Sequence, residues 1–145
     1  EPIRWIGGTD ESFYQHQKIA FFVYLAVNLV ECKILWRRSA DPSAVLWSRL
    51  FTVVLMPWII FLLWYTSAAY YGRFASLLAE VVFANLVTLV APLCCVVVER
   101  HLQRARPGRA FRLLTATLLL IALSQFVLFT YRLPWADVFV QPQLD

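Results

Sequence analysis

The sequence has little charge and few histidines or cysteines for a chain of 145 residues. Asp, Glu, Lys and Arg make up 15% of the chain, whereas an ordinary soluble domain has roughly 25%. Hydrophobic residues make up 61%, against roughly 45–50% in an ordinary soluble domain, and the mean hydropathy is +0.65. This composition argues against a soluble globular domain. It also argues against a disordered chain, because disordered segments are poor in apolar residues.

Metal-ligating residues are scarce and widely spaced. The two histidines, His16 and His101, flank different apolar stretches, so they are not placed to hold a haem between them. Cys32, Cys94 and Cys95 have neither the CxxC spacing of a zinc site nor an even number for a disulfide framework. Nucleophile elbows and phosphate-binding loops are also missing, so the sequence does not indicate an enzyme. We therefore expect no metal ion and no cofactor, and we expect bound lipids.

The dominant feature of the sequence is its long apolar stretches. Four are present, at residues 19–36, 46–71, 75–98 and 111–131. A helix needs roughly 20 apolar residues to cross a hydrocarbon core of about 30 Å, and each stretch approaches or exceeds this length. Hydrophobicity continues around each stretch without alternation, which favours helices over barrel strands. The sequence therefore predicts an all-α, integral membrane bundle of four transmembrane helices, one domain over residues 1–145 with an outer segment at residues 1–18.

Local signals mark two of the helix boundaries. Asp41 followed by Pro42 is typical of a helix start, because the carboxylate can cap the first turn and proline lacks only an N–H that would have no partner there. Pro107 and Gly108 predict a turn between the third and fourth stretches.

Proline and small residues shape the interiors of the second and third stretches. Pro57 and Pro92 each remove a helical hydrogen bond and are expected to kink their helices. Small side chains recur along the third stretch at Ser76, Ala84, Thr88 and Ala91. Because small residues allow neighbouring helices to approach closely, we expect this face to point inward.

Basic residues are distributed unevenly between the two predicted sides. Nine lie near the first and third connections, namely Lys33, Arg37, Arg38, Arg49, Arg100, Arg104, Arg106, Arg109 and Arg112. The other four are Arg4, Lys18, Arg73 and Arg132. The positive-inside rule places the nine in the cytoplasm and both termini on the outer side. The net charge of +4 follows from this asymmetry and does not indicate nucleic-acid binding. The preference for arginine and the compact loops favour a multi-pass protein of the bacterial inner membrane with periplasmic termini, an organelle membrane being the alternative.

A first intramembrane carboxylate is Glu31. An ionised carboxylate inside a bilayer costs about 2.5–3.5 kcal/mol on insertion scales, so it needs a partner or water. Tyr24, Asn28 and Glu31 fall on one stripe of a helix. We expect Arg49 or Arg112 to pair with Glu31, because the helices that carry these arginines begin on the side of the membrane toward which Glu31 lies.

The remaining polar candidates lie on the third and fourth stretches. Glu80 is expected to pair with Arg132. Asn85 and Gln125 are expected near mid-depth as hydrogen-bonding groups between helices. Both glutamates could carry a proton or anchor a ligand, but ion pairs that fix packing explain such residues more often.

The absence of a catalytic or cofactor-binding pattern favours a structural role. Our first hypothesis is an accessory or structural subunit of a larger membrane complex, such as a respiratory, photosynthetic or transport complex, with lipid and other membrane subunits as partners.

Two alternatives remain open. The chain could bind or convert a sterol- or quinone-like molecule between the kinked second and third helices, with Glu80 as its polar partner and Asn85 and Trp58 or Trp64 in the pocket. It could also be a small proton-coupled carrier, which would need water at Glu31 or Glu80.

Overall fold

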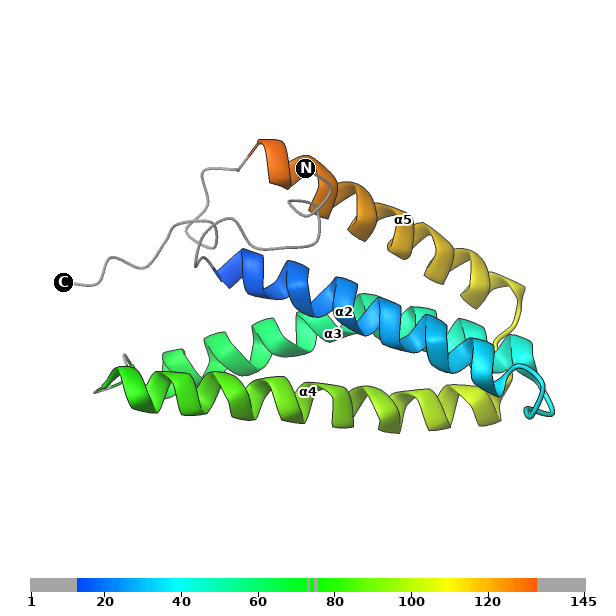
Figure 1. The fold of residues 1–145 in the computed structure, drawn as a ribbon, viewed down its shortest axis with the longest axis horizontal. Helices are drawn as coiled ribbons and strands as arrows, with labels where there is room; N and C mark the ends of the chain where they lie inside the picture. Colours follow the sequence, from blue (N-terminus) through cyan, green and yellow to red (C-terminus); the bar gives the residue numbers. More distant parts are fainter. Residues whose placement is uncertain (1–12, 73, 75, 133–145) are drawn as a thin grey trace.

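Four helices form the described part of this computed structural model, which covers residues 13–72, 74 and 76–132. They are α2 (Phe13–Leu35), α3 (Pro42–Tyr71), α4 (Leu77–Ala105) and α5 (Arg109–Tyr131) (Figure 1). The predicted all-α class is confirmed, and α3, α4 and α5 are long and apolar enough to cross a membrane. The first 12 residues of the predicted outer segment lie outside the described residues, whereas the rest of that segment belongs to α2.

The helix start predicted at Asp41 and Pro42 is confirmed, whereas the end predicted for the third stretch is wrong. Asp41 caps α3 by accepting a 3.0 Å hydrogen bond from the backbone N–H of Ala44, as its position before Pro42 predicts. Helix α4 continues for seven residues past the predicted end of the third stretch, to Ala105. Its last turns are rich in arginine and glutamine, which are good helix formers although they are not apolar. Hydropathy therefore marked where the apolar surface ends rather than where the helix ends.

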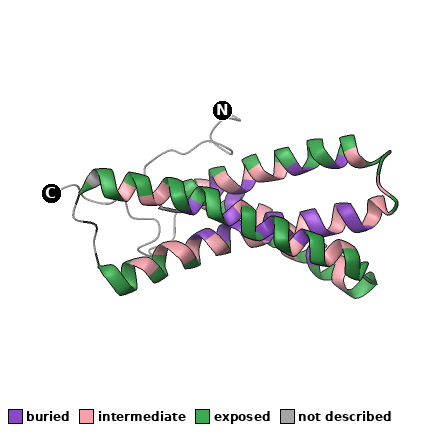
Figure 2. Ribbon diagram, turned by 90° about the horizontal axis from the view of Figure 1, so that it is seen from below, coloured by how far each residue is buried: buried purple, intermediate pink, exposed green. Residues whose placement is uncertain are grey.

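Helix α3 lies at the centre of the bundle and packs against each of the other three helices. Helices α4 and α5 lie on opposite sides of the pair formed by α2 and α3 (Figure 1). The connections at residues 36–41 and 106–108 lie at the same end of the bundle, which we call the basic end. Buried residues gather where the helices cross, whereas the outer sides are exposed (Figure 2).

One apolar core joins α3 to α4. Met56 and Ile60 of α3 pack against Val87, Ala91 and Cys95 of α4. The predicted small-residue face is therefore only partly right. Ala91 is fully buried and Ala84 partly buried, whereas Ser76 and Thr88 are exposed. Thr88 points away because consecutive helical residues project about 100° apart, and its neighbour Val87 occupies the buried face.

A second, aromatic core holds α5 against α2 and α3. It consists of Tyr14, Phe21, Val53 and Phe126, and the rings of Phe21 and Phe126 have centroids 4.9 Å apart. Tilted aromatic pairs at this distance contribute roughly 0.5–1.5 kcal/mol beyond their burial.

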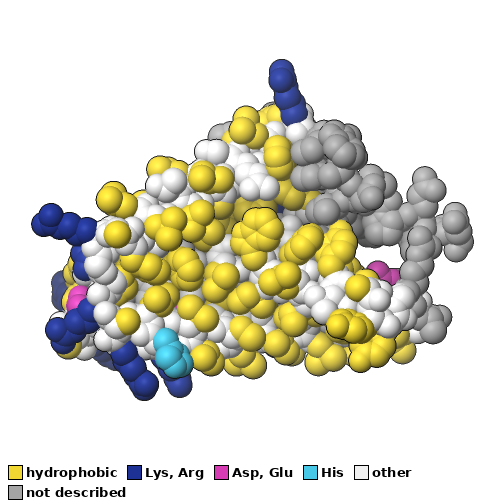
Figure 3. Space-filling view, turned by 180° about the vertical axis from the view of Figure 1, so that it is seen from behind, with side chains coloured by type: hydrophobic (Ala, Val, Ile, Leu, Met, Phe, Trp, Pro, Cys, Tyr) yellow, Lys and Arg dark blue, Asp and Glu magenta, His cyan; other side chains and the backbone are white. Residues whose placement is uncertain are grey.

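The outside of the bundle is apolar between its ends. Figure 3 shows a broad field of hydrophobic side chains, with most of the lysines and arginines on that face gathered at one end. Only 17% of the most apolar window of α4, and 11% of that of α5, is buried within the bundle. Most of the surface of these two helices is therefore available to lipid or to another protein.

Candidate functional site

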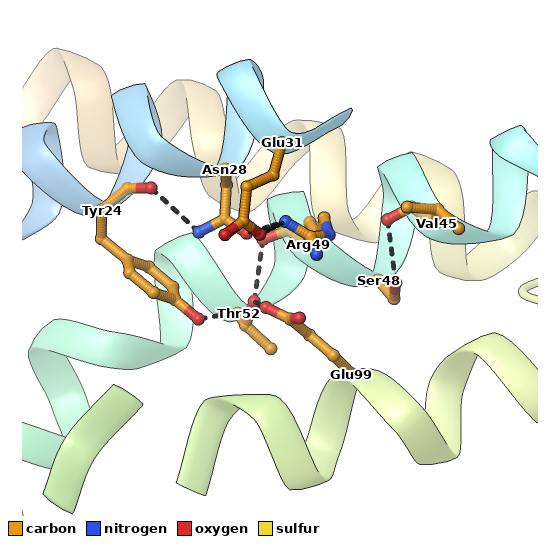
Figure 4. A network of polar contacts seen from close by, with 8 residues as sticks. All are labelled: Tyr24, Asn28, Glu31, Val45, Ser48, Arg49, Thr52 and Glu99. Atoms are coloured by element: carbon orange, nitrogen blue, oxygen red, sulfur yellow. Dashed lines mark hydrogen bonds and ion pairs between the residues drawn. The ribbon is translucent and has the colours of Figure 1, made fainter. Parts of the chain in front are cut away.

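A buried arginine near the basic end organises the largest polar network. Arg49, on the second turn of α3, is 9% exposed and forms an ion pair with Glu31 of α2 (Figure 4). Its Nη1 atom also donates to Oδ1 of Asn28 over 3.2 Å. Of the two partners expected for Glu31, the structure thus selects Arg49. Arg112 instead donates through Nε to the carbonyl oxygen of Pro107 over 3.0 Å.

All three residues of the stripe predicted on α2, namely Tyr24, Asn28 and Glu31, belong to this network. Asn28 donates through Nδ2 to the carbonyl oxygen of Tyr24 over 2.9 Å, which leaves its Oδ1 directed at Arg49. The Tyr24 hydroxyl reaches across to α4 and donates to Oε1 of Glu99 over 3.0 Å. The helical spacing of these residues therefore places three polar groups of α2 against its two neighbours.

Glu99 of α4 is the network residue that the sequence reasoning missed. Its side chain lies inside the bundle, and the residue is 5% exposed. Its Oε1 accepts a second hydrogen bond, over 2.7 Å, from the hydroxyl of Thr52. The signal was available, because continuing the buried face of α4 from Ala91 and Cys95 by one turn reaches Glu99. The predicted third span ended one residue earlier, so Glu99 was not considered as an intramembrane carboxylate.

The network can hold three helices in one register. Arg49 and Thr52 come from α3, Glu31 belongs to α2 and Glu99 to α4. Each side-chain hydrogen bond or ion pair of this network that joins two helices therefore includes Arg49 or Glu99. Hydrogen bonds to charged groups contribute roughly 1.5–3 kcal/mol each. The Nε atom of Arg49 is buried and has no hydrogen-bond partner among the described residues.

The predicted Glu80–Arg132 pair is wrong. Both residues are described, and no ion pair joins them. Glu80 lies in the first turn of α4, where the positive end of the helix dipole favours a carboxylate. Arg132 is exposed just after α5. The prediction failed because it assumed that α4 and α5 are neighbours, whereas they lie on opposite sides of α2 and α3.

The expected interhelical hydrogen bonds of Asn85 and Gln125 are also not seen among the described residues. Both residues are exposed. Asn85 donates through Nδ2 to the carbonyl oxygen of Val81 over 2.8 Å, within its own helix. The carbonyl oxygen of Gln125 lies 3.4 Å from the Tyr14 hydroxyl, which donates to it from α2.

A cavity of about 360 Å³ lies between α2, α3 and α5. Its walls are formed by Tyr14, Gln17, Phe21, Val54, Pro57, Trp58, Phe61, Ala122, Gln125, Phe126 and Phe129. Trp58 lines this cavity, but the cavity does not lie between α3 and α4, where the ligand hypothesis placed its pocket. Glu80 and Asn85 are not among the lining residues, and Trp64 instead packs against Phe83 with ring centroids 5.6 Å apart.

The described residues contain no group of three or more His, Cys, Asp or Glu side chains that could hold a metal ion. The polar network and the aromatic cavity are therefore the two features from which a function can be argued. Comparison of the chain with protein-family models, with curated proteins and with solved structures found no match in any of the three.

Proposed function

We propose that α2 is a fourth transmembrane helix, although its composition is less apolar than that of the other three. Its polar residues Lys18, Asn28 and Gln15 are buried in the bundle. Its outward side chains between residues 19 and 30 are apolar, namely Ile19, Val23, Ala26, Val27, Leu29 and Val30, whereas the charged Glu31 and Lys33 are exposed close to the basic end. A helix with this arrangement presents hydrocarbon to lipid while its polar groups find partners inside.

We further propose that the basic end faces the cytoplasm of a bacterial inner membrane, so that both termini lie on the periplasmic side. Arg49 is buried in α3 and is not a loop charge. The basic residues that remain at this end still outnumber the four predicted on the opposite side. Helix α2 begins and α5 ends at the end opposite the basic end, which supports termini on one side.

The function we propose is that of an accessory or structural subunit of a larger membrane complex of the respiratory, photosynthetic or transport kind. The observation that carries this proposal is the position of Asn85. Its side chain lies on the exposed face of α4, among apolar neighbours such as Val82, Leu86 and Leu89. The Asn85 amide donates one hydrogen bond, to the carbonyl oxygen of Val81, and no other partner of this amide is found among the described residues.

An amide exposed to hydrocarbon is costly, whereas a hydrogen bond to a neighbouring transmembrane helix removes that cost. Thr88 is exposed one turn further along the same helix and leaves room for close approach. We infer that a transmembrane helix of another subunit covers this face of α4 and presents a polar side chain to Asn85.

Replacing Asn85 with leucine is expected to detach this partner. An interhelical hydrogen bond in a membrane contributes about 0.6–1.7 kcal/mol, so retention of partner subunits should fall by about threefold to twentyfold. The measurement is quantitative mass spectrometry of subunits that co-purify in a mild detergent. Ser124→Leu, at an exposed position on α5, is the control and should retain the partners. A wild-type chain that purifies alone would contradict the proposal.

The aromatic cavity favours a second candidate function, the binding of a sterol- or quinone-like molecule. A volume of about 360 Å³ falls in the range of roughly 300–1,000 Å³ that is usual for ligand pockets. The walls are mainly aromatic, and Gln17 and Gln125 supply polar groups for a hydroxyl or carbonyl. Such a lining suits a flat apolar molecule with one polar end.

Filling the cavity tests this candidate. In Ala122→Phe a phenyl ring would project from α5 into the space, so bound lipophilic molecules should be lost from the purified protein. Organic extraction followed by mass spectrometry measures them, and Ala110→Phe, at an exposed position at the start of α5, is the matched control. Equal amounts of the molecule in both variants would argue against this cavity as its site.

A further inference from the structure

An open groove of about 620 Å³ lies at the basic end, apart from the polar network and the aromatic cavity. It runs between the connection that precedes α3 and the last two turns of α4. Arg100 and Arg104 of α4 line one side together with Arg106, and Asp41 and Val45 line the other. The groove therefore combines three arginines with the apolar residues Ala40, Ala44 and Val45, which we call its apolar floor.

The three arginines are available to an external anion. None of them forms an ion pair or a side-chain hydrogen bond with any residue of the described chain, and all three are exposed. The carboxylate of Asp41 is already engaged by the backbone of its own helix, because it accepts from the N–H of Ala44. The lining carries three positive charges against one negative charge, so its formal excess is positive.

The backbone at Arg106 is unusual and bears on this groove. Its φ of 52° lies in the left-handed region, which glycine adopts far more readily than arginine. Arg106 is the only residue other than glycine with a positive φ in the described part of the chain. A glycine here would end α4 equally well, but it would leave the groove without its third guanidinium group.

The groove begins where the apolar surface ends. Val96 and Val97, about one turn before Arg100, are exposed and apolar. In a chain that spans a bilayer, this boundary lies at the level of the lipid headgroups. Arginine is suited to phosphate because its planar fork of N–H donors matches the phosphate oxygens.

We propose that this groove is a binding site for a phosphate group, held by Arg100, Arg104 and Arg106. Its depth in the bilayer favours the phosphate of an anionic lipid as the source, with the start of the acyl chains lying on the apolar floor. A soluble phosphate compound would offer the same chemistry. The two sources are separated by experiment.

The test compares two triple variants that lose the same charge. Arg100→Gln, Arg104→Gln and Arg106→Gly together remove the groove cations. Glutamine is a good helix former, and glycine suits the left-handed backbone, so the fold should be kept. The control combines Arg37→Gln, Arg38→Gln and Arg109→Gln, three exposed arginines of the basic end that do not line the groove.

Delipidated protein in a neutral detergent is titrated with phosphatidylglycerol, phosphatidylcholine and inorganic phosphate, and bound molecules are counted by native mass spectrometry. We expect saturable binding of phosphatidylglycerol that falls by about tenfold or more in the groove variant and by less than about twofold in the control. Phosphatidylcholine, whose phosphate is neutralised by its own choline, should bind weakly to all three proteins.

Binding of inorganic phosphate without phosphatidylglycerol, lost only in the groove variant, would retain the phosphate site and identify the source as soluble. Equal losses in the two triple variants would overturn the proposal, because general attraction between the basic end and an anion would then explain the binding. Failure of both probes to bind the wild-type protein would overturn it as well.

Discussion

Replacing Arg49 with methionine is expected to lower the free energy of unfolding by about 1.5–3 kcal/mol, because Arg49 is buried and donates to buried Asn28 as well as pairing with Glu31, whose side chain is half exposed. Arg49 is the only cation in the network that joins α2, α3 and α4. Its loss leaves Glu31 without a partner and removes the donor to Asn28. Methionine has a similar length and a flexible, apolar side chain, so the loss of packing volume is small.

The stability can be measured by thermal or denaturant unfolding in detergent micelles. Arg38→Met, at an exposed arginine of the basic end, is the matched control and should change stability by less than about 0.5 kcal/mol. The double variant Arg49→Met, Glu31→Met should recover much of the loss, because it leaves no unpaired charge from this pair. If Arg49→Met and Arg38→Met proved equally stable, the network would not hold the helices together.

Removing both hydroxyl donors from Glu99 is expected to cost about 3 kcal/mol or more, since a hydrogen bond to a charged group contributes roughly 1.5–3 kcal/mol. The variant combines Tyr24→Phe and Thr52→Val, which remove one oxygen each and keep nearly the same shape. The Glu99 side chain would then lie inside the bundle with neither hydroxyl to stabilise it.

Two features of this experiment separate the carboxylate from the packing. Tyr70→Phe and Thr88→Val make the same chemical changes at exposed positions and should be nearly neutral. Adding Glu99→Met to the Tyr24→Phe, Thr52→Val protein should restore stability, because no buried charge would then need donors. A loss that Glu99→Met does not reverse would show that the hydroxyls act through packing alone.

Local patterns in the sequence were enough to predict the helices and one half of the network. The length of each apolar stretch depends only on the residues within it, and the cap formed by Asp41 needs only the next three residues. The pairing of Glu31 with Arg49 was within reach because a short connection makes consecutive helices neighbours. These predictions required no knowledge of how the bundle is arranged.

The predictions that failed concern contacts between helices. The Glu80–Arg132 pair required α4 to lie beside α5, and Asn85 and Gln125 were each expected to hydrogen-bond to another helix. A short turn joins α4 to α5 at the basic end, but α5 packs against α2 and α3 and diverges from α4. Glu99 was missed for a different reason, since hydropathy falls at the first charged residue even where the helix and its buried face continue.

The division of the polar network between α2 and α3 has a consequence for biosynthesis. With α2 as the proposed fourth transmembrane helix, Glu31 leaves the ribosome ahead of its counter-ion Arg49. Arg49 follows about 18 residues later in the chain, near the start of α3. If α2 spans the membrane as proposed, we therefore expect α2 and α3 to insert together as a helical hairpin, because Arg49 of α3 pairs with Glu31 of α2.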